Sequence, residues 1–140
     1  MPTLFTRIIN GELPGRFVWK DDRAVAFMTI APIRPGHVLV VPREEIDHWI
    51  DMPTDLAHHV MEVSQHVGRG IQKAFSPEKV GVMLAGLEVP HVHLHLLPID
   101  AIADLDFSKQ KNDATAGELD EAAEKIRTAL RELGYRQVAG

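Results

Sequence analysis

The sequence predicts a single α+β domain with a five-stranded, mainly antiparallel sheet. Three observations support this class: five short apolar segments separated by turn residues, a long amphipathic segment between the third and the fourth, and a second amphipathic segment near the C-terminus. The length of 140 residues suits one domain, and a hydrophobic content of 45% is enough for a core. The chain has no cysteine, which excludes disulfides and thiolate metal sites.

The first part of the chain predicts a short helix followed by three strands. Residues 4–9 carry apolar side chains at helical spacing, and a run with two glycines and a proline ends that segment. A loop with two prolines precedes the third strand, and Pro42 ends it. The strands are predicted at residues 17–20, 24–28 and 37–41.

The rest of the chain predicts a long helix, two strands and a final helix. Apolar residues recur every three or four positions between Pro53 and Phe75, as in an amphipathic helix. Gly68 and Gly70 each cost this helix up to ~1 kcal/mol relative to Ala, which indicates close packing at that point. We take residues 1–99 as the core of the domain, and residues 100–140 as a polar loop and a helix packed on it. The last elements are predicted at residues 80–84, 91–97 and 118–133.

Charge and hydropathy exclude several classes of partner. The net charge is −5 and no basic stripe is present, which argues against binding to nucleic acid or to an anionic membrane. No apolar run approaches the roughly 18–20 residues that span a bilayer, and the N-terminus lacks the features of a signal peptide. We therefore expect a cytoplasmic protein.

Three of the eight histidines alternate in one predicted strand, at His91, His93 and His95. Alternate side chains share one face of a strand, so the apolar residues between them face the other way. Neighbouring imidazoles resist being charged together, which keeps unprotonated nitrogens available near pH 7. Such a row can be purely structural, can bind a metal with Glu88 or His37, or can attack phosphorus as a nucleophile. Structural roles are predicted for the other four histidines, His48, His58, His59 and His66.

The segment from His91 to Leu97 resembles the signature of the histidine triad (HIT) family, His-φ-His-φ-His-φ-φ with φ hydrophobic. Residues 4–14, 21–27 and 35–43 resemble the blocks that precede this signature in the family. The likeness covers about residues 4–99 and is strongest to the Hint-like branch of small bacterial members. It implies a HIT-like fold of five antiparallel strands and two main helices, and a homodimer whose sheets join into one.

The resemblance also implies a nucleotide-binding hydrolase or nucleotidyl transferase that cleaves phosphoramidate or phosphoanhydride bonds of a nucleotide, commonly a purine nucleotide. His93 would be the nucleophile that forms a nucleotidyl-histidine, with His91 and His95 orienting it and contacting the phosphate. His37 lies where the family has a fourth active-site histidine. Main-chain N–H groups, and no metal or cofactor, would stabilise the phosphoryl oxygens. The base pocket would map to four residues that are equally well explained as core: Phe5, Ile8, Leu13 and Phe27.

Several residues depart from the family pattern around the expected substrate. Thr29 stands where an acidic residue usually binds the ribose hydroxyls, and its side chain makes fewer and weaker hydrogen bonds. The loop before the triad is about five residues shorter, with Leu87 in place of a glutamine. Glu88, followed by Val89, takes the place of a hydroxyl that meets the phosphate. A carboxylate there is unfavourable unless it is protonated, turned away or paired with a cation.

Thr3 and Thr6 stand where some bacterial members have a zinc-binding Cys-x-x-Cys, so no zinc site is expected. The polar loop at residues 109–113 is expected to cover the site. Two alternative functions stay open: a nucleotide-binding or signalling module with little turnover, and a metal-binding protein that uses the histidine row.

Overall fold

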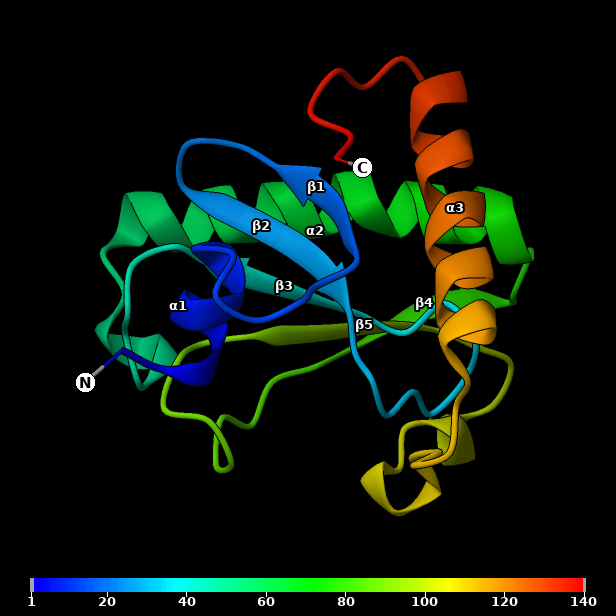
Figure 1. The fold of residues 1–140 in the computed structure, drawn as a ribbon, viewed down its shortest axis with the longest axis horizontal. Helices are drawn as coiled ribbons and strands as arrows, with labels where there is room; N and C mark the ends of the chain where they lie inside the picture. Colours follow the sequence, from blue (N-terminus) through cyan, green and yellow to red (C-terminus); the bar gives the residue numbers. More distant parts are fainter. Residues whose placement is uncertain (1, 140) are drawn as a thin grey trace.

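One antiparallel sheet organises the chain in the computed structural model, which describes residues 2–139. Its strand order is β1-β2-β3-β5-β4 (Figure 1). The predicted α+β class with five strands is confirmed. The helices are α1 (Leu4–Ile9), α2 (Thr54–Phe75) and α3 (Ala116–Glu132), and the strands are β1 (Phe17–Lys20), β2 (Ala24–Met28), β3 (Val38–Pro42), β4 (Lys79–Met83) and β5 (Leu94–Ile99).

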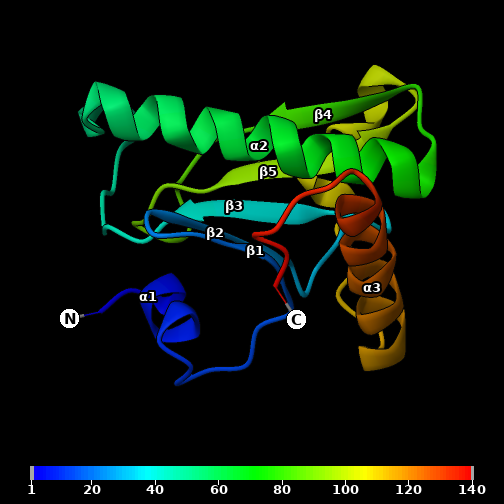
Figure 2. The same cartoon turned by 90° about the horizontal axis from the view of Figure 1, so that it is seen from above.

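The central strands are buried on both faces. Every residue of β2 and β3 is buried, because α2 covers one face of the sheet and α1 lies against the other (Figure 2). Side chains such as Ala26 and Val40 join the main core beneath α2. Their neighbours Phe27 and Leu39 point to the α1 side and form a smaller apolar cluster with Phe5. The α1 side is the one that carries the histidines of the predicted site.

Helix α3 packs on α2 through a close contact at Gly70. A Cβ built at Gly70 would lie 2.7 Å from Cδ2 of Leu130, whereas a Cβ at Gly68 would meet only Val80, at 3.9 Å. The close packing predicted for this part of the helix therefore occurs at Gly70 alone. None of the helices among residues 2–139 is both long and apolar enough to cross a membrane.

These two glycines give a matched pair of stability predictions. Gly70→Ala gains helix propensity but drives a methyl group into Leu130, so we expect a net loss of roughly 1–2 kcal/mol of unfolding free energy. Gly68→Ala gains the same propensity in open space and is expected to stabilise the protein by about 0.5–1 kcal/mol. Urea unfolding of both variants tests this. Equal effects at the two positions would contradict the packing argument.

Strand β5 differs from the prediction at both ends. It begins at Leu94 rather than three residues earlier, because its partner β3 ends at Pro42, which has no N–H to donate. The N–H of Val92 instead donates to the carbonyl of Ile46, at 2.7 Å. The strand also continues through Pro98, which lies beyond the last residue paired with β3, where a missing N–H is tolerated.

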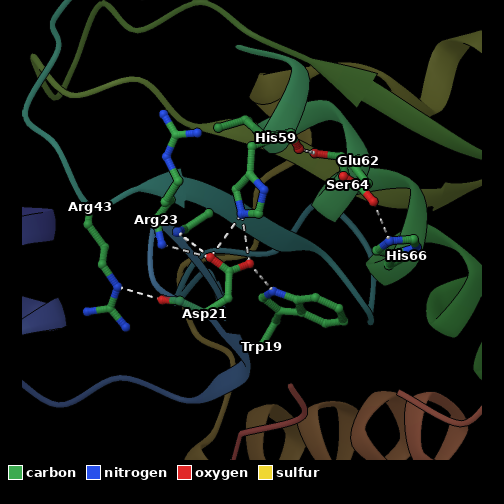
Figure 3. A network of polar contacts seen from close by, with 10 residues as sticks. Trp19, Asp21, Arg23, Arg43, His59, Glu62, Ser64 and His66 are labelled. Carbon is green, nitrogen blue, oxygen red and sulfur yellow. Dashed lines mark hydrogen bonds and ion pairs between the residues drawn. The ribbon is translucent and has the colours of Figure 1, made fainter. Parts of the chain in front are cut away.

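The turn between β1 and β2 is held by Asp21 (Figure 3). Its carboxylate accepts hydrogen bonds from the Trp19 indole at 2.8 Å and from the main-chain N–H groups of Arg23 and Ala24. His59 on α2 lies 2.9 Å from both carboxylate oxygens. Burial alone raises the pKa of Asp21, but these hydrogen bonds outweigh it and lower the pKa below its ordinary value. His59 thus ties α2 to the hairpin and takes no part in the histidine site.

The two edges of the sheet differ. The C-terminal tail runs beside β1, where Val138 bridges Trp19 and the N–H of Lys20 donates to the carbonyl of Gln137 at 2.9 Å. At the opposite edge, β4 has no neighbouring strand among residues 2–139, and Val82 on it is exposed. One edge is therefore covered within the chain and the other is left available for pairing.

Candidate active site

A cavity of about 580 Å³ opens on the α1 side of the sheet. Helix α1 and the turn after it form one wall, β2 and β3 contribute apolar side chains, and His93 and His95 also line the cavity. The loops around Thr29 and Gln110 also line it. The predicted site residues found in its lining are Phe5, Ile8, Leu13, Phe27, Thr29, Glu88, Val89, His93 and His95.

His93 is fixed in one tautomer. Its Nδ1 lies 2.8 Å from the carbonyl oxygen of His91. A carbonyl only accepts hydrogen bonds, so Nδ1 carries the hydrogen and Nε2 keeps its lone pair. Nε2 has no hydrogen-bond partner within residues 2–139. Every buried side-chain nitrogen or oxygen in that range does have a partner, so Nε2 is not buried and is accessible from the cavity that His93 lines.

Burial also keeps His93 neutral. It lowers the pKa of the imidazole, although the hydrogen bond to the His91 carbonyl and the nearby Glu88 carboxylate partly oppose the shift. The Phe5 ring packs edge-on against the imidazole, with ring centroids 4.8 Å apart. Nε2 of His93 is therefore accessible, neutral and held in one orientation, which are the properties that a nucleophilic histidine requires.

His37 and His95 form a second fixed arrangement beside His93. The N–H of Ile33 donates to Nδ1 of His37 at 3.0 Å, so His37 carries its hydrogen on Nε2. That Nε2–H donates to Nδ1 of His95 at 2.9 Å, which leaves the hydrogen of His95 on its Nε2. His95 therefore offers an N–H donor at the edge of the cavity, where it can meet a phosphoryl oxygen.

Both of these histidines are held neutral. Burial, and secondarily the neighbouring His95, lowers the pKa of His37 to about 3. Burial, with a smaller contribution from His93, lowers the pKa of His95 to about 4. The relay of hydrogen bonds from Ile33 through His37 to His95 is thus intact at neutral pH.

His91 lies behind the cavity and has no free ring nitrogen. Its Nε2 donates to the carbonyl of Pro42 at 2.6 Å, and its Nδ1 accepts from the hydroxyl of Thr3, also at 2.6 Å. The side chain is fully buried. The expected contact of His91 with a phosphate is therefore not possible in this arrangement. The residue orients His93 through its own main-chain carbonyl.

Thr3 offers a test of this anchoring. Its hydroxyl serves His91 and also accepts the N–H of Thr6 at the start of α1. Thr3→Val would leave a buried ring nitrogen unsatisfied and remove the cap, and we expect a loss of roughly 1–3 kcal/mol in unfolding free energy. Thr3→Ser, which keeps the hydroxyl, should lose less than half of that. Equal losses in urea unfolding of the two variants would show that the hydroxyl does not hold His91.

The residues that depart from the family pattern lie in different surroundings. Glu88 and Val89 line the cavity, but Leu87 does not: it is 93% exposed and borders a separate crevice beside His48. The prediction that Leu87 contacts substrate is not supported by this geometry. Thr29 lines the cavity while its hydroxyl oxygen accepts the N–H of Ala31 at 3.1 Å.

The connection before α3 contributes residues that the sequence pattern did not identify. Gln110 and Asn112 line the cavity, and Phe107 packs edge-on against His95 with ring centroids 4.8 Å apart. The polarity of residues 109–113 predicts a cover over the site but singles out no side chain. The available signal is Phe107, the only aromatic residue in the sequence between Asp100 and Thr115.

The described histidines are not arranged for a metal ion. Within residues 2–139, no group of three or more histidine, aspartate or glutamate side chains is placed to hold one. The nitrogens of His37 and His91 are already used in hydrogen bonds. The resemblance aligns Thr3 with a zinc-binding cysteine of some bacterial members. Here the main-chain N–H of Thr3 donates to the Glu45 carboxylate at 2.7 Å.

Fold and site together define a class: small α+β proteins in which alternating histidines precede and enter a central strand beside an apolar cavity. The family comparison agrees, since the model of the HIT domain matches residues 10–102. The chain belongs to the HIT family.

Individual relatives support the same assignment. An uncharacterised HIT-like protein of Methanocaldococcus jannaschii is 35% identical over 99 residues, which cover 68% of this chain and 77% of the relative. The crystal structure of a HIT-like protein from Bartonella henselae superposes with a TM-score of 0.78 at 30% identity, covering 91% of this chain and 95% of that one. A hypothetical histidine triad nucleotide-binding protein of Sulfolobus tokodaii gives a TM-score of 0.79 at 25% identity, with 92% of each chain covered.

Proposed function

We propose that this protein is a nucleotide hydrolase or nucleotidyl transferase that works through a covalent intermediate on His93. The observation that carries the proposal is the tautomer of His93, which presents a neutral Nε2 to the cavity. The cavity volume of about 580 Å³ lies within the range of small-molecule sites. The similarity to a protein described as nucleotide-binding in Sulfolobus tokodaii supports the same class of ligand.

The reaction has two steps. Nε2 of His93 attacks the α-phosphorus, a phosphorus–nitrogen bond forms, and the bond to the leaving group breaks. A leaving amine takes up one proton from solvent water, whereas a leaving phosphate departs as its anion. Water then attacks the phosphorus, the phosphorus–nitrogen bond breaks, and the nucleotide is released with one proton. The Nε2–H of His95 stabilises the negative charge on the phosphoryl oxygen in both steps.

We place the nucleobase on the apolar wall of the cavity, next to the histidines. Phe5, Ile8, Leu13 and Phe27 line that apolar part, and the base is the least polar part of a nucleotide. A purine suits it because a two-ring base buries more apolar area than a one-ring base. The two aromatic residues also form an edge-on pair, at 5.6 Å between ring centroids, that keeps the wall rigid.

We also propose that two copies of the chain pair through β4. The strand lies at an open edge of the sheet with Val82 exposed, and exposed Met61 of α2 lines the adjoining groove. An uncovered edge strand next to apolar side chains is a ready surface for antiparallel pairing with a second copy. Such a pair would continue the sheet across both subunits.

Intact-mass spectrometry tests the proposed chemistry. The protein is mixed with a panel of nucleoside phosphoramidates and dinucleoside polyphosphates and quenched without acid, beside His93→Ala as the control. A nucleotidyl mass on the wild type that is absent from the variant supports the mechanism and identifies the base. Absence of both adduct and product with every member of the panel would overturn it.

A second candidate function is a nucleotide-binding module with little turnover. Glu88 favours it, because a carboxylate in the lining beside His93 repels a substrate phosphate. Nucleotide binding without adduct or product in the same experiment is the result that this alternative predicts.

A further inference from the structure

The connection between β5 and α3 is fastened to the loop that follows β2. The side-chain Nε2 of Gln110 donates to the carbonyl of Ala31 at 3.0 Å, and the main-chain N–H of Lys111 donates to the carbonyl of Pro32 at 2.8 Å. These bonds hold the segment in one place against the rim of the cavity. The segment is therefore a fixed part of the cavity wall.

Arg34 adds a second anchor to the same loop. Its guanidinium pairs with Asp100 and with Asp104, each at 2.9 Å, so that the start of the connection is also tied to the residues after β2. In Figure 1 this connection lies below the sheet, between the end of β5 and the start of α3. The wall therefore reaches the cavity from a part of the chain outside the HIT signature.

Gln110 and Asn112 both line the cavity, one on each side of Lys111. Gln110 has an extended conformation, with φ −59° and ψ 133°. Lys111 itself is not part of the cavity lining. The Lys111 side chain instead pairs with Glu118 of α3, at 2.9 Å.

The polar side chains of the cavity lining fall into two groups. His93, His95 and Glu88 are the groups that the proposed reaction places near the phosphate. The others are the neutral side chains of Thr29, Gln110 and Asn112. Arg16 also lines the cavity, but its guanidinium is paired with Asp120 of α3 at 2.6 Å.

A nucleotide has three parts with different chemistry. If its phosphate lies at His93 and its base lies on the apolar wall, the part that remains is the sugar with its two hydroxyls. Each hydroxyl is both a donor and an acceptor, and an amide side chain offers both complements without placing a further negative charge near the phosphate. The Thr29 oxygen already accepts the N–H of Ala31, so the amides are the better partners.

We infer that Gln110 and Asn112 bind the sugar hydroxyls of the nucleotide and make the site selective for ribonucleotides. The inference rests on the proposed function, and it assigns a specificity role to residues outside the HIT signature. The Oε1 of Gln110 accepts from one hydroxyl while its Nε2 stays on Ala31, and Asn112 serves the other. Two such hydrogen bonds correspond to roughly tenfold in affinity.

Calorimetric titration tests this with AMP and GMP and with their 2′,3′-dideoxy counterparts. For the base that binds, we expect the wild type to prefer the ribonucleotide by roughly tenfold. In the double variant Gln110→Ala/Asn112→Ala the preference should fall below about twofold. Lys111→Ala, on the same segment but outside the cavity lining, is the matched control and should keep the wild-type preference.

The outcomes separate this inference from the proposed function. A wild type that binds ribo and dideoxy forms equally, or a preference that survives the double variant, overturns the sugar assignment while leaving the chemistry of His93 intact. A wild type that binds none of the four nucleotides and forms no adduct with the substrate panel overturns both. Asn112→Ala alone changes an exposed side chain, so a partial loss of preference is measurable even if the double variant folds poorly.

Discussion

His93→Ala is expected to lower turnover by at least about 10³-fold, because it removes the only group proposed to form a bond to phosphorus. Nucleotide affinity should change by only a few-fold, since the apolar wall and the sugar contacts remain. Steady-state hydrolysis of whichever panel substrate gives the adduct measures the first quantity, and calorimetry with the product nucleotide measures the second. A large drop in rate with preserved binding is the signature of a lost nucleophile.

The control for this prediction is a histidine outside the site. His58 is exposed on α2, and His58→Ala should leave the rate unchanged. His93→Asn provides a second check, because its amide fills part of the imidazole space yet cannot form the intermediate. If either His93 variant kept more than a tenth of the wild-type rate, a nucleophilic role for His93 would be excluded.

The pH dependence of the same reaction follows from the environment of His93. Burial lowers the pKa of the imidazole, so its nucleophilic neutral form persists on the acid side of the ordinary value of 6.5. The acidic limb of the rate profile should therefore lie below pH 6.5.

The elements of the fold were predictable because each has a local signal. The apolar stripe of α2 and the alternation around His93 follow from side-chain periodicity alone, which requires no knowledge of distant contacts. The run at residues 38–42 shows the limit of prediction from periodicity. All of its residues are buried, so the pattern indicates a strand but not which face meets which helix.

The chemistry of the site was only partly predictable, because it depends on partners far away in the sequence. His93 and His95, which the alternating pattern singles out, both line the cavity. Their tautomers, however, are set by main-chain groups of His91 and Ile33, and the second of these acts through His37. No spacing rule reports which ring nitrogen meets a carbonyl.

The two misplaced expectations have physical reasons of the same kind. The resemblance implies that His91 meets the phosphate, but its ring nitrogens are bound to the Pro42 carbonyl and the Thr3 hydroxyl, in the segment before β5 begins at Leu94. Leu87 was expected at the substrate, but it follows Gly86, whose φ of +75° turns the chain so that Leu87 extends into solvent. Both depend on backbone direction over one or two residues, which residue type alone does not determine.

The second large expected effect is a loss of stability at acidic pH. Stability should fall steeply between about pH 6.5 and pH 4.5, before most carboxylates titrate. In the folded protein His37 and His95 stay neutral down to about pH 3 and 4, whereas in the unfolded chain they take up protons near the ordinary value of 6.5. Between these values the unfolded state binds more protons, so acidification favours unfolding.

The size of the effect follows from linkage. Each histidine held neutral costs about 1.4 kcal/mol per pH unit below about 6.5, so the two together remove about 5 kcal/mol by pH 4.5. That is a large part of the stability of a typical domain, about 5–15 kcal/mol. The carboxylates with lowered pKa, such as Asp21, act in a separate window, because their contribution is lost only as pH falls below their ordinary value of 3.8.

Urea unfolding at pH 7, 6 and 5 measures this slope directly. His37→Gln removes one of the buried imidazoles and should reduce the slope by about 1.4 kcal/mol per pH unit. His58→Gln, at an exposed position on α2, should leave the slope unchanged. A wild-type stability that stays flat from pH 7 to pH 5 would mean that protonated His37 and His95 are tolerated in the fold. The relay that orients the Nε2–H of His95 would then not be fixed, and the role given to that donor in both chemical steps would fail with it.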